Sequence, residues 1–112
     1  MPDQRGMSLI LSEVFPLLSQ ELQQLLIEAG EADLASQVSA LRIVDRCRCG
    51  DDFCASFYTQ PKPNGAYGPS HRNVVLNPAK GMLILDVVDG VIAHVEALYR
   101  NDIRESLQEV MP

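Results

Sequence analysis

The sequence has few aromatic residues, few basic residues and no long apolar run. Tryptophan is absent, and aromatic side chains make up only 5% of the 112 residues. The 9 Lys and Arg residues face 15 Asp and Glu residues, and this net charge of −6 argues against binding to nucleic acids or anionic membranes. No apolar run approaches the about 20 residues of a membrane-spanning helix. The sequence therefore predicts an ordinary globular protein with a single domain, 1–112.

The chain also lacks a secretory signal pattern and an even number of cysteines. Its first apolar stretch is interrupted by Ser12 and Glu13, and Asp3 lies where a signal peptide is basic. Three cysteines cannot all pair within one chain. Both features predict a cytoplasmic protein whose cysteines remain thiols or metal ligands.

Apolar residues spaced three and four apart predict a pair of helices in residues 1–41. The first apolar face consists of Leu11, Phe15, Leu18, Leu22, Leu25 and Ala29. Since proline is tolerated only in a first turn, either this helix begins near Ser12 or a short helix precedes a new start near Pro16. Gly30 favours the end of the first helix. The second helix has its apolar positions at Leu34, Val38 and Leu41.

Five short strands are predicted in residues 42–99. They cover residues 42–49, 54–59, 73–76, 81–88 and 91–99. Asp89-Gly90 lies between two β-branched runs and favours a two-residue turn, because both central residues of that turn need positive φ. The resulting register pairs Val88 with Val91, Asp86 with Ala93, and Ile84 with Val95.

In this register both faces of the last hairpin are largely apolar. One face would carry Met82, Ile84, Val88, Val91, Val95 and Ala97, and the other Leu83, Leu85, Val87, Ile92, His94 and Glu96. Helices that cover one side of the sheet would leave the second apolar face unburied. We therefore expect that face to meet another helix or a second subunit, which predicts a homodimer formed through a sheet face.

A short C-terminal helix is predicted over residues 101–111. Asp102 and Glu105 have the spacing of a capping box at its start. Strands clustered between helices indicate an α+β fold. The expected architecture is an N-terminal helix pair, a meander-like antiparallel sheet of about five strands and this C-terminal helix.

All three cysteines fall within eight residues of a predicted hairpin. With Gly50–Phe53 as its loop, Cys49 lies opposite Cys54 and Cys47 lies opposite Ser56. The three thiols then converge, and His71 from the following loop can complete a Cys₃His zinc site. The spacing differs from the usual Cys-x₂₋₄-Cys pattern. A disulfide-forming redox pair and plain packing of small apolar side chains therefore stay open as alternatives.

This hairpin also carries a resemblance. The run Arg46–Thr59, with Cys-x-Cys-Gly-x₃-Cys at its centre, and the later runs Gly81–Asp86 and Asp89–Glu96 resemble a group of small bacterial proteins of uncharacterised function. The resemblance covers about residues 42–105. It implies a bacterial cytosolic protein and brings no activity, cofactor or catalytic residue to this chain.

The loop 60–73 is the second candidate site. Loops of this length are usually functional or disordered, and Tyr67, His71 and Arg72 are its recognition-capable residues. Residues 42–80 carry six basic and three acidic side chains and form the basic region of an acidic chain. The loop either closes over a small anion held by Arg72 and Arg48, as a binder or an enzyme would, or only covers a sheet edge.

Catalytic motifs are not evident. His94 lies two residues from Glu96, but no nucleophile at a known spacing accompanies them, and a simple His–Glu contact is the alternative. The chain has no Gly-rich phosphate loop, no His-Glu-x-x-His and no nucleophile elbow. The sequence therefore favours a non-enzymatic interaction or regulatory domain, with a zinc- or thiol-dependent module as the second hypothesis.

Overall fold

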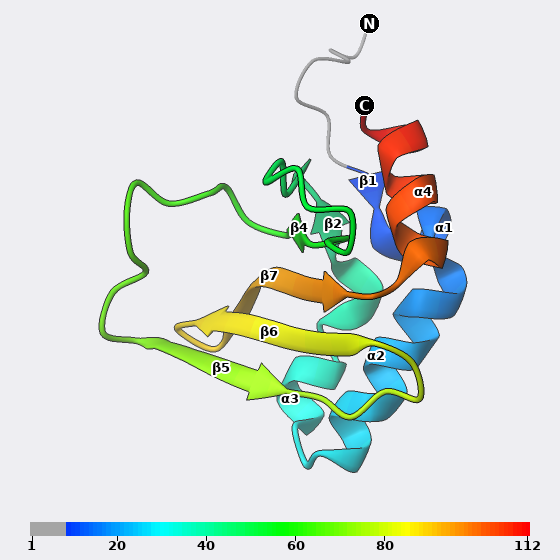
Figure 1. Ribbon diagram of the computed structural model, residues 1–112. Coiled ribbons are helices and arrows are strands. Elements are labelled where there is room, and N and C mark those ends of the chain that lie inside the picture. Colours follow the sequence, from blue (N-terminus) through cyan, green and yellow to red (C-terminus); the bar gives the residue numbers. More distant parts are fainter. Residues whose placement is uncertain (1–8) are drawn as a thin grey trace, which may run out of the picture.

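The computed structural model describes residues 9–112, and its elements are shown in Figure 1. The helices are α1 (Leu11–Val14), α2 (Pro16–Glu28), α3 (Ala32–Ala35), the 3₁₀ helix η1 (Val38–Ala40) and α4 (Asn101–Val110). The strands are β1 (Leu9–Ile10), β2 (Arg42–Ile43), β3 (Asp45–Arg46), β4 (Phe57–Tyr58), β5 (His71–Val75), β6 (Met82–Val88) and β7 (Val91–Leu98). Residues 1–8 lie outside the described residues. The prediction that the chain has no secretory signal rests in part on them.

The helices cover one face of an antiparallel sheet, as the sequence predicts for an α+β fold. The sheet has five strands in the order β3-β4-β7-β6-β5, and β1 pairs with β2 in a separate two-stranded sheet. The last three strands form a meander, and the β3–β4 hairpin pairs with β7 on its other side. In Figure 1 the α2 and α3 helices lie behind the sheet, and its other face is open. No helix in residues 9–112 is long and apolar enough to cross a membrane.

The α2 helix begins and ends at the residues that the sequence marks. The sequence left two starts open for the first helix, near Ser12 or near Pro16. The structure has the later start, since α2 begins at Pro16 after the short helix α1. Gly30 follows α2 with a φ of 77°, a conformation that glycine adopts without steric cost. The predicted second helix is wrong as one element. Residues 32–40 instead form α3 and η1, and each is too short to bury a continuous row of apolar side chains.

The β6–β7 hairpin has the predicted turn but a different register beyond it. Asp89 and Gly90 have φ values of 53° and 77°, and Val88 pairs with Val91. Asp86 then pairs with His94 instead of the predicted Ala93, because a β-bulge adds Ala93 to β7. The bulge reverses the two faces of β7 after this point.

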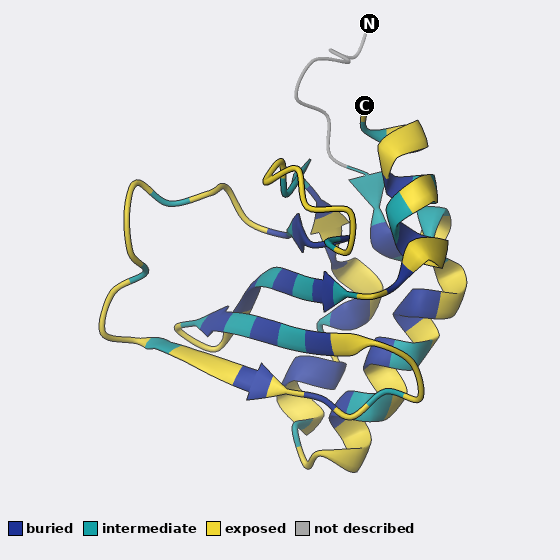
Figure 2. Ribbon diagram, viewed as in Figure 1, coloured by how far each residue is buried: buried dark blue, intermediate teal, exposed yellow. Residues whose placement is uncertain are grey.

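This register corrects the predicted membership of the two faces, because the bulge moves Val95 and Ala97 to the face of Leu83 and Leu85, and His94 and Glu96 to the opposite face. One face is buried against the helices and carries Leu83, Leu85, Val87, Ile92, Val95 and Ala97. On the open face, Asp86, His94 and Glu96 are partly buried and stand among apolar residues that are partly buried or exposed. Figure 2 shows buried and less buried positions alternating along β6. The core therefore lies between the sheet and the helices. Phe57 from β4 and Leu22 and Leu26 from α2 are among its fully buried side chains.

The C-terminal helix is held to α2 by a buried arginine. Arg100 is 5% exposed and donates hydrogen bonds to Glu21 at 3.1 and 2.8 Å and to Asp102. The predicted capping box is wrong, since Arg100 is the N-cap residue and no side chain caps the helix. Asp102 lies inside the first turn, where it contacts Arg100. The positive end of the helix dipole stabilises its negative charge there.

Candidate functional site

The three cysteines meet at one end of the sheet. Asp45 pairs with Tyr58, and the Cys47 amide donates to the Ser56 carbonyl at 2.9 Å, so the predicted placement of Cys47 opposite Ser56 is confirmed. The regular strands are shorter than predicted, since β3 ends at Arg46 and β4 begins at Phe57. The sulfur atoms of Cys47, Cys49 and Cys54 nevertheless all lie within 4.8 Å of one another. Such a cluster can hold a metal ion.

The three thiols differ in exposure and in acidity. Cys49 is exposed, and Cys47 and Cys54 are partly buried. Burial, reinforced by the neighbouring thiols, raises the pKa of Cys47 to about 11. Burial also acts on Cys54, but hydrogen bonding with Ser56 and contact with the other two thiols outweigh it and lower the pKa of Cys54 below its ordinary value. Cys54 therefore loses its proton before Cys47.

A cavity of about 250 Å³ adjoins the thiols. It is lined by Cys47 and Cys49 from the hairpin, and by Tyr58 and Lys62. Arg48 also lines it and forms an ion pair with Asp45 at 3.1 Å. The cysteine cluster thus opens onto a space lined by three basic side chains, Arg46, Arg48 and Lys62, and one acidic side chain, Asp45.

His71 is not part of the cysteine cluster, although the sequence offers it as the fourth ligand. Its Nε2 lies 2.7 Å from Asp86 Oδ1. Asp86 Oδ2 lies 3.0 Å from Nδ1 of His94, and Asn73 donates to Oδ1 at 2.7 Å. Asp86 therefore joins strands β5, β6 and β7 through a cluster that we call the Asp86 cluster: His71, Asn73, Asp86 and His94.

The hydrogen bonds of Asp86 orient both imidazoles. A carboxylate only accepts hydrogen bonds, so His71 presents Nε2–H and His94 presents Nδ1–H. In a neutral imidazole the second nitrogen carries a lone pair. Aromatic rings flank the pair, with Tyr67 at 4.8 Å from the His71 ring and Tyr58 at 4.5 Å from the His94 ring. Carboxylate-oriented imidazoles of this kind accept protons or metal ions.

The two clusters lie on the same open face of the sheet. One cross-strand row consists of Asp45, Tyr58, His94, Asp86 and Asn73. Tyr58 contacts the His94 ring and also lines the cavity beside the thiols. Burial, followed by the negative charges of Cys47 and Asp45, raises the pKa of Tyr58. Tyr58 therefore separates the cysteine cluster from the Asp86 cluster.

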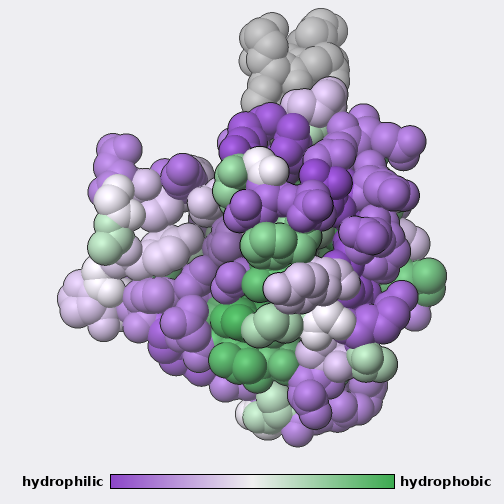
Figure 3. Space-filling model, in the orientation of Figure 1, coloured by the Kyte–Doolittle hydropathy of each residue, from purple (hydrophilic) through white to green (hydrophobic). Residues whose placement is uncertain are grey.

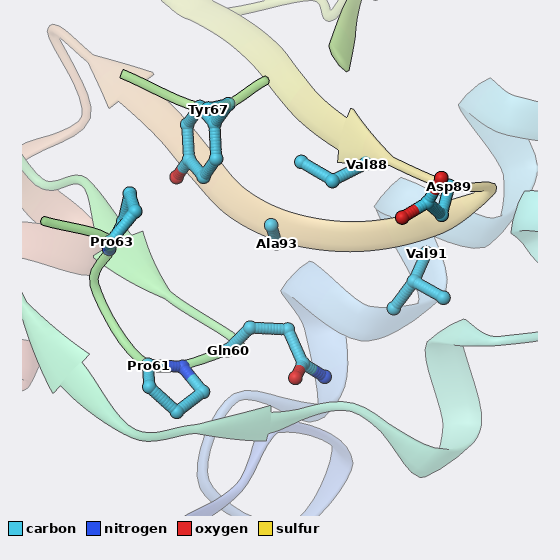
Figure 4. A pocket seen from close by; sticks show the side chains of 8 residues that line it. All are labelled: Gln60, Pro61, Pro63, Tyr67, Val88, Asp89, Val91 and Ala93. Carbon is cyan, nitrogen blue, oxygen red and sulfur yellow. The ribbon is translucent and has the colours of Figure 1, made fainter. Parts of the chain in front are cut away.

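The loop 60–73 encloses a second cavity of about 330 Å³ beside the Asp86 cluster. In Figure 4, Tyr67 and Gln60 point toward Val88, Val91 and Ala93 across this space. The residues within 9–112 that line this cavity are mostly apolar, and none of them is basic.

Arg72, predicted to hold an anion in this loop, points elsewhere. It makes a two-pronged ion pair with Glu31 at 3.0 and 2.9 Å. The guanidinium lowers the pKa of Glu31 through these hydrogen bonds. An anion bound by Arg72 would have to displace this pair.

Sequence reasoning missed Asp86 and gave His94 the wrong partner. It placed Glu96 beside His94, whereas His94 bonds to Asp86. The break in the alternation of apolar and polar residues between Ile92 and Val95 is the signal that could have indicated the bulge.

Comparisons of the chain with protein-family models, curated proteins and solved structures gave no match.

Proposed function

We propose that this protein is a thiolate metal-binding module in which Cys47, Cys49 and Cys54 hold one zinc-class ion. The observation that carries the proposal is the convergence of three sulfur atoms within 4.8 Å in a single short hairpin. Thiolates prefer borderline and soft cations such as Zn²⁺ and Cu⁺ over Mg²⁺ or Ca²⁺. The acidic chain elsewhere offers carboxylates, but all three of its cysteine thiols are in this hairpin.

The sulfur positions suit tetrahedral coordination. Zinc–sulfur bonds of about 2.3 Å place the sulfurs of a tetrahedral site about 3.8 Å apart. The present cluster therefore needs to contract by about 1 Å or less. Cys49 is exposed and Gly50 follows it with a φ of 85°, so this part of the hairpin can adjust without disturbing the core.

The site offers three ligands among the described residues, and this number favours an exchangeable ion. Structural zinc sites usually have four protein ligands, whereas sites that react with or pass on their ion keep one position open. Exposure of Cys49 gives an incoming ligand access to that position. The module is therefore suited to sensing or transferring a metal ion.

Cobalt titration tests the proposal, because Co²⁺ in a thiolate site has intense sulfur-to-metal absorption. We expect about one Co²⁺ per chain, displaced by Zn²⁺, and about a hundredfold weaker binding after Cys54→Ser, since serine is a poor ligand for such ions. Asp51→Asn and Asp52→Asn are the matched controls in the same hairpin and should bind as the parent does. Absence of thiolate absorption in the reduced protein would overturn the proposal, as would a disulfide between two of the three cysteines that persists under reducing conditions.

Self-association is a second candidate function, favoured by an apolar patch on the open face. Val75 is 69% exposed and Met82 is 42% exposed. Their partners on β6 and β7 are Ile84 and Leu98, which are partly buried. Figure 3 shows hydrophobic residues gathered on this side of the molecule. A second copy of the chain would bury this patch against its own equivalent.

Light scattering after size-exclusion chromatography measures this association. We expect a dimer at micromolar concentration that Val75→Lys converts to monomer, because burying an unpaired ammonium in an apolar interface is costly. Leu17→Lys is the matched control, since Leu17 is 79% exposed on α2, away from the open face. A parent protein that is monomeric across this range rules the dimer out.

A further inference from the structure

We infer that the open coordination position of the cysteine-bound metal takes a small thiol that also carries a carboxylate, with Lys62 as the residue that recognises the carboxylate. The inference rests on the proposed metal function and names the ligand class of the same site. It is carried by the cavity beside the thiols and by the charges that line it.

The cavity has the size of a small organic molecule. Its volume is about 250 Å³, and it is lined by both Cys47 and Cys49. One water molecule occupies about 30 Å³ in the liquid, so the space exceeds what a single metal-bound water needs. A ligand of a few carbon atoms can therefore reach the metal from this cavity and remain partly enclosed.

The two arginines that line the cavity already donate hydrogen bonds from their side chains. Arg46 donates to the Met111 carbonyl at 2.6 Å and to the Cys47 carbonyl. Arg48 bonds to Asp45 and to the Pro112 carbonyl. Lys62 also lines the cavity, and it has no ion pair with any residue in the range 9–112. Among the described residues that line the cavity, Lys62 is therefore the cation whose side chain has no hydrogen-bond partner and can bind a ligand without giving one up.

The chemistry of the metal and the charge of Lys62 together select the ligand. A soft thiolate set favours a further sulfur ligand over oxygen. A divalent ion with three thiolates carries one net negative charge, which disfavours a second anionic group unless a cation balances it. Lys62 supplies this balance for a carboxylate, and the Tyr58 hydroxyl lines the same cavity as a further donor.

The exchange is balanced without an oxidant. The metal–oxygen bond to a coordinated water breaks, a metal–sulfur bond to the ligand forms, and the thiol proton passes to solvent. The three protein thiolates keep their bonds to the metal. The product has four sulfur ligands, as in closed zinc sites.

Cobalt-loaded protein tests the inference with three probes. 3-Mercaptopropionate carries a thiol and a carboxylate, cysteamine carries a thiol and an ammonium group, and propionate has no thiol. We expect 3-mercaptopropionate to change the Co²⁺ spectrum at the lowest concentration, cysteamine to need about tenfold more, and propionate to leave the spectrum unchanged. Added salt should reduce the difference between the two thiols, because Lys62 is exposed.

Lys62→Gln should remove the difference between the two thiols while leaving cobalt affinity unchanged. Lys80→Gln is the matched control, since Lys80 is also an exposed lysine but does not line the cavity. Failure to bind cobalt would overturn the proposed function itself. Cobalt binding with a spectrum that no thiol changes would overturn this inference alone, as would equal binding of both thiols by the parent protein.

Discussion

Zinc is expected to raise the free energy of unfolding of this protein by about 4 kcal/mol when free zinc exceeds its dissociation constant about a thousandfold. The reason is that the three sulfurs lie within 4.8 Å only in the folded hairpin. In the unfolded chain the same thiols are no longer held together, so the free energy of metal binding adds to that of folding. For a domain of this size, each kcal/mol shifts the unfolding midpoint by about 4–8 °C.

Thermal unfolding by circular dichroism, with and without zinc, measures this gain. Chelation should return the midpoint to that of the metal-free protein. Cys54→Ser should show nearly the same midpoint with and without zinc, whereas Asp52→Asn should respond as the parent does. An equal gain in the parent and in Cys54→Ser would mean that zinc binds elsewhere, and the assignment to the cysteine hairpin would be wrong.

The effect of zinc should grow as the pH rises. Metal ions bind the thiolate form, and protons compete most strongly at Cys47, whose pKa is raised to about 11. Below that pH, zinc must displace the Cys47 proton, so its affinity falls as the pH falls. The metal-free protein should behave in the opposite way. Because the ordinary pKa of this thiol is 9.0, the folded state loses stability as the pH rises from about 9 to about 11.

The geometry of the cysteine cluster follows from local sequence. A four-residue loop, Gly50–Phe53, fixes which residues of a hairpin face each other, and alternation then places Cys47 and Cys49 on one face. No information about distant elements is needed. For this reason the convergence of the thiols could be predicted, even though the regular strands β3 and β4 proved to be shorter.

The Asp86 cluster depends on two features that local sequence does not fix. The first is the bulge at Ala93, which turns His94 to the open face, where it meets Asp86. The second is the pairing of β5 with β6, which brings His71 and Asn73 to the same carboxylate. Strand order is decided by packing over the whole sheet. The contact of His71 with Asp86 therefore emerged only from the structure.

Removal of the Asp86 carboxylate is expected to lower the free energy of unfolding by about 2 kcal/mol, because Asp86→Ala leaves three donors without their acceptor. The donors are His71, His94 and Asn73, at 2.7, 3.0 and 2.7 Å. The side chains of Asp86 and His94 are 18% and 14% exposed, so water replaces the lost hydrogen bonds only in part. The same change frees both rings from their present orientation.

Asp86→Asn should lower the free energy of unfolding by about half as much as Asp86→Ala. The amide oxygen still accepts from two donors, while the amide nitrogen needs an acceptor. A histidine can supply that acceptor by moving its proton to the other ring nitrogen, which restores the hydrogen bond with the opposite polarity. Urea unfolding gives the three stabilities, and ¹⁵N NMR of the imidazoles reports the change of tautomer in Asp86→Asn.

Asp89→Asn is the matched control for these variants. Asp89 is an exposed carboxylate in the β6–β7 turn with a φ of 53°, a conformation that asparagine also tolerates. Its substitution should change stability by less than about 0.5 kcal/mol. If Asp86→Ala were as mild as Asp89→Asn, Asp86 would not hold the open face of β5, β6 and β7 together. If the imidazole signals were the same in Asp86→Asn and in the parent, the carboxylate would not set the tautomers of His71 and His94.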